Sequence, residues 1–177
     1  MTQTKWFDRK FDFSTEQNIF PSIIERLAGT AARLDEKLPS IPSQLLDIKP
    51  GGTWSIKENI GHLSDLEPLW RGRLEDIIHG KPELRPTDLL NRNTDLANHN
   101  SQSITALLHT FRTTRNQTLQ MLNNIDTATI FKSALHPRLK TPMRTMDLFL
   151  FVAEHDDHHL AKISELSRIF KKDLTVK

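Results

Sequence analysis

The sequence predicts an all-α protein, a four-helix bundle, from two observations. Four long stretches place apolar residues at alternating steps of three and four, which is the period of an amphipathic helix. Between these stretches there is no credible set of strands. Four such helices bury their apolar faces by packing together, and the polar loops are long enough to cross over between helices that are not adjacent.

The first helix is expected after a short extended N-terminal segment. Asn18 is its predicted N-cap, and Pro21 then falls in the first turn, where a missing N–H costs nothing. Pro39 and Pro42 end the helix. Its apolar face carries Phe20, Ile24, Leu27, Ala31, Leu34 and Leu38.

A second helix is expected after Ser55, because Ser55 and Glu58 have the spacing of a capping box. Pro68 removes one backbone hydrogen bond inside the pattern and predicts a kink near His62. The Gly-Lys-Pro sequence at residues 80–82 ends the helix. Its apolar face carries Ile56, Ile60, Leu63, Leu66, Trp70, Leu74 and Ile77.

The second half of the chain alternates loops and helices. Residues 83–100 are polar and rich in Asn and Pro, which predicts a long loop with about one helical turn. A third helix is expected over about residues 103–123. Residues 134–142 contain a His-Pro and a Thr-Pro pair and are expected to form a non-helical strap. Thr145 is the predicted N-cap of the fourth helix.

The composition indicates an ordinary globular protein. A chain of 177 residues suits one domain with a real core, so residues 1–177 are expected to form a single domain. No apolar run reaches the roughly 18 residues needed to span a bilayer, and the N-terminus lacks the apolar segment of a secretory signal. A cytoplasmic protein without membrane contact is therefore expected.

Charge and cysteine content exclude other classes. The net charge is +2 and the pI about 9.0, with basic residues scattered among acidic ones, so we expect no nucleic-acid partner. The chain contains no cysteine, which excludes disulfides, thiolate metal ligands and cysteine nucleophiles. Nitrogen and oxygen atoms must therefore hold any metal ion.

Histidines stand in the middle of the apolar face of the fourth helix. His155 and His159 are four residues apart and point inward with the core residues, so both rings can reach one metal ion. His158 and Asp156 project to opposite flanks, and Asp157 projects toward water. The same spacing also fits core histidines whose ring nitrogens are hydrogen-bonded, and this segment alone favours neither reading.

Two segments resemble a known family. Residues 51–67 read GGTWSIKENIGHLSDLE and residues 154–163 read EHDDHHLAKI. They are similar, in the expected order, to the two signatures of the DinB/YfiT-like superfamily, and the His-Pro pair before the last helix also fits. The resemblance covers about residues 18–170, which we take as the core of the domain.

The resemblance implies a DinB/YfiT-like four-helix bundle in which His62, His155 and His159 bind one divalent metal ion. It implies a metal-dependent hydrolase acting on a small-molecule substrate, although some members are thiol S-transferases and many have no known activity. Members are often dimers, which makes a homodimer a candidate assembly. One departure is Lys162, which stands where the family usually has Gln; its position on the flank should not disturb the metal.

Three neutral imidazoles leave a coordination position open, as in a catalytic metal site. A divalent ion there lowers the pKa of bound water and polarises a carbonyl or phosphoryl oxygen. Zn²⁺ or Ni²⁺ is the expected ion, with Mn²⁺ or Fe²⁺ as alternatives. Glu58 and Asp156 are the candidate general bases or ligand-positioning groups, although Glu58 also closes the capping box and Asp156 is expected on a solvated flank.

Two functional classes remain open from the sequence. As an enzyme, the protein hydrolyses a small molecule or transfers a low-molecular-weight thiol, whose acidic groups Arg73, Arg112 and Arg115 could bind. As a non-enzyme, it is a metal-binding, stress-associated bundle. His158 is expected at the rim of the pocket. His136 lies on a loop that can fold over the site, although a loop histidine is usually solvated.

Overall fold

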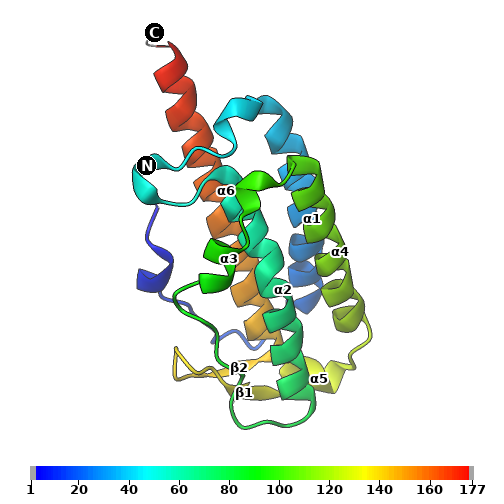
Figure 1. The fold of residues 1–177 in the computed structure, drawn as a ribbon. Helices are drawn as coiled ribbons and strands as arrows, with labels where there is room; N and C mark the ends of the chain where they lie inside the picture. The colour runs from blue at the N-terminus through cyan, green and yellow to red at the C-terminus, as the bar shows by residue number, and fades with distance from the viewer. Residues whose placement is uncertain (1–2, 176–177) are drawn as a thin grey trace.

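Four long helices form the body of the molecule (Figure 1). The computed structural model describes residues 3–175, and the side chains as far as Phe170. The all-α prediction is confirmed, and the strap between the third and fourth long helices is non-helical as expected. The long helices are α1 (Phe20–Lys37), α2 (Ile56–Ile78), α4 (Ile104–Asn123) and α6 (Thr145–Thr175).

The order of the helices around the bundle differs from their order in the chain. The helix α1 packs against α4 and α6, and α2 packs against the same two helices. Helices α1 and α2 therefore lie on one diagonal, and α4 and α6 on the other. Two of the connections must cross an end of the bundle, as the long polar loops allowed.

Short elements fill these connections. The strap forms a two-stranded antiparallel hairpin, which pairs Ser133 with Arg144 and Leu135 with Pro142 and lies at one end of the bundle (Figure 1). The sequence pattern missed these strands because three residues are too few to show an alternation. The short elements are α3 (Arg92–Leu96), α5 (Thr127–Phe131), β1 (Ser133–Leu135), β2 (Pro142–Arg144) and the 3₁₀ turns Trp6–Asp8, Leu38–Ser40, Ser43–Leu45, Pro50–Gly52 and His99–Ser101.

The capping box of α2 is confirmed and the predicted cap of α1 is wrong. Ser55 Oγ accepts a hydrogen bond from the Glu58 amide at 3.1 Å, and Glu58 Oε2 accepts one from the Ser55 amide at 2.8 Å. In α1 the N-cap residue is Ile19, while Asn18 Oδ1 accepts from the Phe20 amide at 3.1 Å. Asn18 thus still satisfies an end N–H, from one position further out.

The predicted cap of α6 is also wrong. The helix continues directly from β2, so the Thr145 amide donates to the Lys132 carbonyl at 3.0 Å, and the buried Thr145 Oγ1 has no hydrogen-bond partner within the described residues. Asp147 Oδ2 accepts instead from the Arg144 amide at 2.9 Å. In α2, Pro68 lies inside the helix without ending it.

A layer of buried polar groups divides the core into two apolar clusters. One polar residue from each long helix contributes to this layer, and all four are 2% exposed or less. On each helix, apolar residues of one cluster precede the polar residue and those of the other cluster follow it. The four residues of this polar layer are Thr30, Glu67, Arg115 and Asp156.

The polar layer is held together by one guanidinium group. Arg115 Nη1 and Nη2 donate to the two Asp156 oxygens at 2.6 and 3.0 Å, and Arg115 Nε donates to Glu67 at 2.7 Å. Thr30 Oγ1 also donates to Asp156, at 2.7 Å. The expectation that Asp156 lies on a solvated flank is therefore wrong, because α4 supplies a buried cation to that flank of α6.

Candidate metal centre

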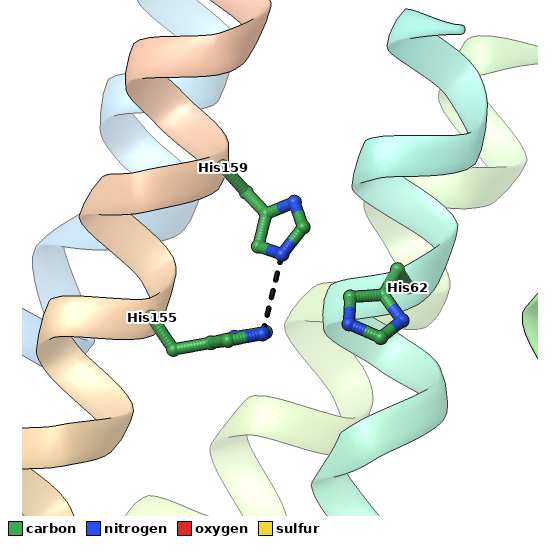
Figure 2. A group of neighbouring side chains, drawn as sticks. All are labelled: His62, His155 and His159. Carbon is green, nitrogen blue, oxygen red and sulfur yellow. Dashed lines mark hydrogen bonds between the residues drawn. The ribbon is translucent and has the colours of Figure 1, made fainter. Parts of the chain in front are cut away.

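Three histidines from two helices point toward one another (Figure 2). His62 comes from α2, and His155 and His159 come from consecutive turns of α6. One ring nitrogen of each lies within 4.8 Å of the others, and the Nε2 atoms of His155 and His159 are 3.2 Å apart. The structure thus brings together the three residues predicted as metal ligands, and all three are buried.

Two of the rings are oriented by hydrogen bonds to Nδ1. Asn59 Nδ2 donates to the Ser55 carbonyl at 2.7 Å, which turns Asn59 Oδ1 toward His159 Nδ1 at 2.8 Å. Because an amide oxygen only accepts, His159 must carry its proton on Nδ1. The lone pair of His159 is therefore on Nε2, facing His155.

The same reasoning applies to His62. Thr94 Oγ1 donates its proton to Asp65 Oδ2 at 2.8 Å, and it lies 2.9 Å from His62 Nδ1. The Thr94 oxygen must then accept a proton from His62 Nδ1. The lone pair of His62 is consequently on Nε2, which is the arrangement that outer hydrogen bonds impose on metal-binding imidazoles.

A fourth buried histidine supports this arrangement. His99 Nε2 lies 2.9 Å from Asp65 Oδ2, so Asp65 joins His99 to Thr94 and through it to His62. Gly61 permits the contact, because a Cβ at this position would lie 2.3 Å from the His99 ring. The sequence reading missed Asn59, Thr94 and His99. Asp65 could have been found from the sequence, because it lies three residues after His62 on the same helix and is therefore its neighbour.

Burial keeps the three imidazoles neutral. It lowers the pKa of His62 to about 4, against the opposing effect of the Asp65 carboxylate. Burial also lowers the pKa of His155 and of His159 well below the usual value, and the neighbouring imidazoles lower both further. Neutral rings are the form that binds metal ions, so this electrostatic environment suits a cation between them.

Aromatic rings wall the site. Measured between centroids, the Trp54 ring lies 4.5 Å from the His62 ring and the Trp6 ring lies 4.9 Å from the His155 ring. A cavity of about 110 Å³ runs beside the three histidines between these walls. This is room for several water molecules or a small organic group.

Neither predicted base lines this cavity. Glu58 closes the capping box and accepts from Lys49 Nζ at 2.7 Å. Burial opposes ionisation of Glu58, but the hydrogen bonds from Lys49 and Ser55 outweigh it and lower the pKa of this carboxyl. Asp156 is engaged by Arg115 and Thr30. Catalytic roles for Glu58 and Asp156 stay predictions, and both carboxylates have structural partners.

The remaining histidines of the motifs lie on the cavity wall. His158 lines the cavity, and its buried Nδ1 has no hydrogen-bond partner in the described part of the chain. His136, from the strap, is only 2% exposed and lines the same cavity, so the expectation that it is solvated is wrong. The strap is held there because the Leu135 amide donates to the Pro82 carbonyl at 2.9 Å.

The fold and the site together define a helical-bundle protein with a buried three-histidine group suited to a metal ion. The family model described as the DinB superfamily matches residues 23–163. The chain therefore belongs to the DinB superfamily.

A solved structure is similar to this chain in fold. YfiT from Bacillus subtilis, described as a probable metal-dependent hydrolase with an unusual four-helix bundle topology, aligns with a TM-score of 0.77. The alignment covers 92% of this chain and 94% of YfiT, at 21% sequence identity. No protein of curated function matches the chain. Among the described residues, no helix is long and apolar enough to cross a membrane.

Proposed function

We propose that the protein is a metal-dependent hydrolase that binds one divalent ion through His62, His155 and His159. The observation that carries this proposal is the orientation of His62 and His159. Each donates a hydrogen bond from Nδ1–H, so the lone pair on its Nε2 is available to a cation. A metal ion bound there supplies a Lewis acid that activates water and polarises the substrate. Zn²⁺ or Ni²⁺ suits three nitrogen ligands, and Mn²⁺ or Fe²⁺ is the alternative.

The residues of the chain have separate tasks in this proposal. Asn59 and Thr94 hold the two imidazoles in their binding tautomers. Trp6 and Trp54 line the cavity and pack against His155 and His62, which lowers the polarity around the proposed metal ion and strengthens electrostatic interactions there. The cavity, which His136 and His158 also line, would hold a small-molecule substrate beside the metal ion.

A second candidate, thiol S-transfer, is favoured by one observation. Glu58 and Asp156 both have structural partners, and neither lines the cavity. A thiol that coordinates a divalent metal loses its proton outright, so this reaction does not need a carboxylate base. Hydrolysis and thiol transfer share the metal site and differ in the nucleophile.

The first test is the metal content of the untagged protein as purified, measured by elemental analysis. We expect about one divalent ion per chain, lost in His62→Ala, His155→Ala and His159→Ala. His158→Ala is the matched control, because His158 lies on the same turn of α6 and lines the cavity but is not one of the three grouped histidines. It should keep its metal.

Two results would overturn the ligand assignment. One is loss of metal from His158→Ala as well; the other is a protein that stays without metal after incubation with Zn²⁺, Ni²⁺ and Mn²⁺. If the metal is present, ester and amide hydrolysis should be assayed beside transfer of a small thiol to an electrophile. The His62→Ala variant should be inactive in whichever assay the wild type shows turnover.

A further inference from the structure

Two arginines on the cavity wall have no carboxylate partner among the described side chains. Arg73, from α2, is 1% exposed, and Arg138, from the turn of the β1–β2 hairpin, is half-buried. Both line the cavity beside the three histidines. The Nη2 atom of each guanidinium is buried and has no hydrogen-bond partner among the residues that the structure describes. A buried charged donor without an acceptor is costly, so these two atoms point to a missing acceptor.

Each of the two guanidinium groups lies over an aromatic ring. The Cζ atom of Arg73 lies over the Trp70 ring at 5.5 Å, and the Cζ atom of Arg138 lies over the Phe7 ring at 5.2 Å. A cation–π contact uses the charge of the guanidinium and none of its hydrogen bonds, so the buried Nη2 groups stay available for a planar or tetrahedral oxyanion. Arg73 is fixed further because its Nε donates to the Arg85 carbonyl at 3.0 Å.

His136 adds to the excess of donors on this wall. Its Nδ1 atom lies 3.2 and 3.1 Å from the amides of Arg138 and Leu139, and its Nε2 atom lies 3.1 Å from Arg73 Nη1. A neutral imidazole accepts at only one ring nitrogen, so one of these contacts pairs a donor with a donor. Burial first, and then the two arginines, lower the pKa of His136 to about 4, which keeps the ring neutral.

The nearby acids are already engaged. Asp76 accepts from the Arg85 side chain and amide, at 2.8 to 2.9 Å. Asp88, on the rim of the cavity, accepts from the Leu90 and Arg92 amides at 2.9 and 2.8 Å. The contrast with the other two arginines suggested by the sequence is clear, because Arg112 pairs with Asp35, and Arg115 pairs with Glu67 and Asp156.

We infer that this wall is an anion subsite, in which Arg73 and Arg138 bind the carboxylate or phosphate group of a small molecule. The subsite adjoins the histidines, since the Trp70 ring that contacts Arg73 lies 5.9 Å from the His155 ring. A molecule held by its oxyanion on this wall extends along the cavity toward the three Nε2 atoms. That this molecule is the substrate rests on the proposed function; the binding of the anion does not.

The test is titration of the full-length protein with inorganic phosphate and with acetate at constant ionic strength, using chloride as the reference ion. All three tryptophans of the chain line the cavity, so their fluorescence reports on its occupancy. The variants are Arg73→Gln and Arg138→Gln, with Arg112→Gln as the matched control for loss of an arginine elsewhere. His62→Ala and metal analysis of each sample separate the subsite from the metal.

We expect saturable binding of at least one anion, weakened about tenfold or more in Arg73→Gln and Arg138→Gln and unchanged in Arg112→Gln and His62→Ala. Tighter binding of phosphate or of acetate identifies the group that the substrate carries. Circular dichroism checks folding; if Arg73→Gln is unfolded, the less buried Arg138→Gln decides the result.

Three outcomes would overturn the inference: no saturable binding of either anion, wild-type affinity in both arginine variants, or loss of binding in His62→Ala alone. The last outcome would place the anion on the metal and leave the proposed function standing. If the protein binds no metal but binds an anion through the two arginines, the anion subsite stands and the proposed function fails.

Discussion

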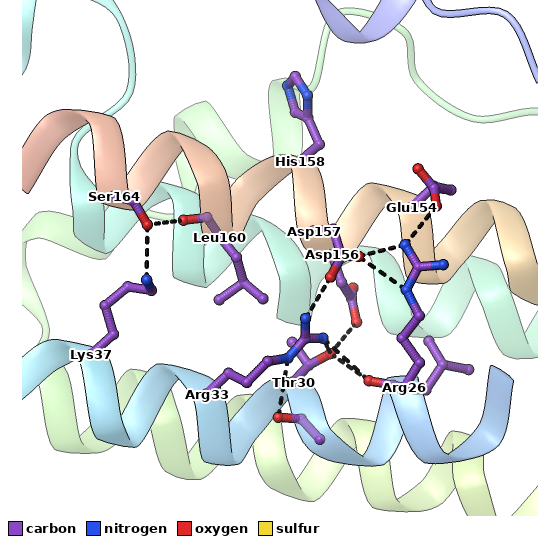
Figure 3. Close-up of polar contacts among 12 residues, drawn as sticks. Arg26, Thr30, Arg33, Lys37, Glu154, Asp156, Asp157, His158, Leu160 and Ser164 are labelled. Atoms are coloured by element: carbon purple, nitrogen blue, oxygen red, sulfur yellow. Dashed lines mark hydrogen bonds and ion pairs between the residues drawn. The ribbon is translucent and has the colours of Figure 1, made fainter. Parts of the chain in front are cut away.

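The segment from Glu154 to His159 presents two faces of α6 that differ in how their polar groups are satisfied. All three carboxylates of the segment have a cationic partner: Glu154 and Asp157 both pair with Arg26 of α1 (Figure 3), and Asp156 pairs with Arg115 of α4. The histidines differ: the Nε2 atoms of His155 and His159 face each other beside α2, and His155 Nδ1 has no hydrogen-bond partner among the described residues.

The paired carboxylates stabilise the packing of the helices, whereas the histidines retain nitrogen atoms that could bind a ligand. On the α1 face, charge is neutralised within the chain, so a further ligand would have to displace an existing ion pair. Among the histidines and in the adjoining cavity, several buried imidazole and guanidinium nitrogens have no hydrogen-bond partner within the described part of the chain, which costs folding free energy that a bound ligand would recover. The polar groups without internal partners therefore lie on the side of this helix where we propose the metal site.

The largest expected change in stability comes from replacing Arg115, which pairs with the two buried carboxylates of the polar layer. Arg115→Met leaves the Glu67 and Asp156 carboxylates buried without a counter-charge, which should lower the free energy of unfolding by about 3–5 kcal/mol. Urea denaturation measures the change. Arg112→Met, which breaks an exposed ion pair, should cost less than about 1 kcal/mol. Equal stabilities for these two variants would show that the polar layer does not behave as a buried charge network.

The stability of the metal-free protein should depend on pH through the buried histidines. The folded state lowers the pKa of His62 from 6.5 to about 4, chiefly through burial. Between pH 6.5 and about 4, the unfolded chain therefore binds a proton at His62 that the folded chain does not. The contribution of His62 to stability is fully present above pH 6.5 and is lost as the pH falls toward 4. The loss attributable to His62 should approach about 3 kcal/mol.

Denaturation of the chelator-treated protein at several pH values between 7 and 4 measures this loss. In His62→Gln, which cannot titrate, the dependence on pH should be shallower by the contribution of one histidine. A wild-type and a variant protein with parallel stability curves would mean that His62 is not buried in its neutral form.

The smallest of these effects should come from an outer hydrogen bond. Thr94→Val keeps the shape of the side chain but removes the oxygen that orients His62, so metal affinity should fall by about tenfold with all three ligands in place. Competition with a chelator measures the affinity. Thr110→Val, an exposed change on α4, is the control. Unaltered affinity in Thr94→Val would show that the tautomer of His62 does not depend on this contact.

Periodicity predicted the helices and the direction of their apolar faces well. The stripe of α6 correctly placed His155 and His159 in the core, and the family signature added His62. Local chemistry was less reliable where a helix begins directly after a strand: Thr145 is the first residue of α6 and not its N-cap, and the Asp147 carboxylate accepts the amide of Arg144 there. The catalytic roles of Glu58 and Asp156 stay untested predictions.

The sequence by itself determined which residues lie on the inner face of each helix, because the repeat of 3.6 residues per turn fixes the direction of every side chain relative to its own axis. Only the tertiary structure decided which groups meet. Asp156 finds Arg115 on another helix, and His62 finds Thr94 on an irregular loop. These partners are far apart in the chain, and no local period records how two helices and a loop pack.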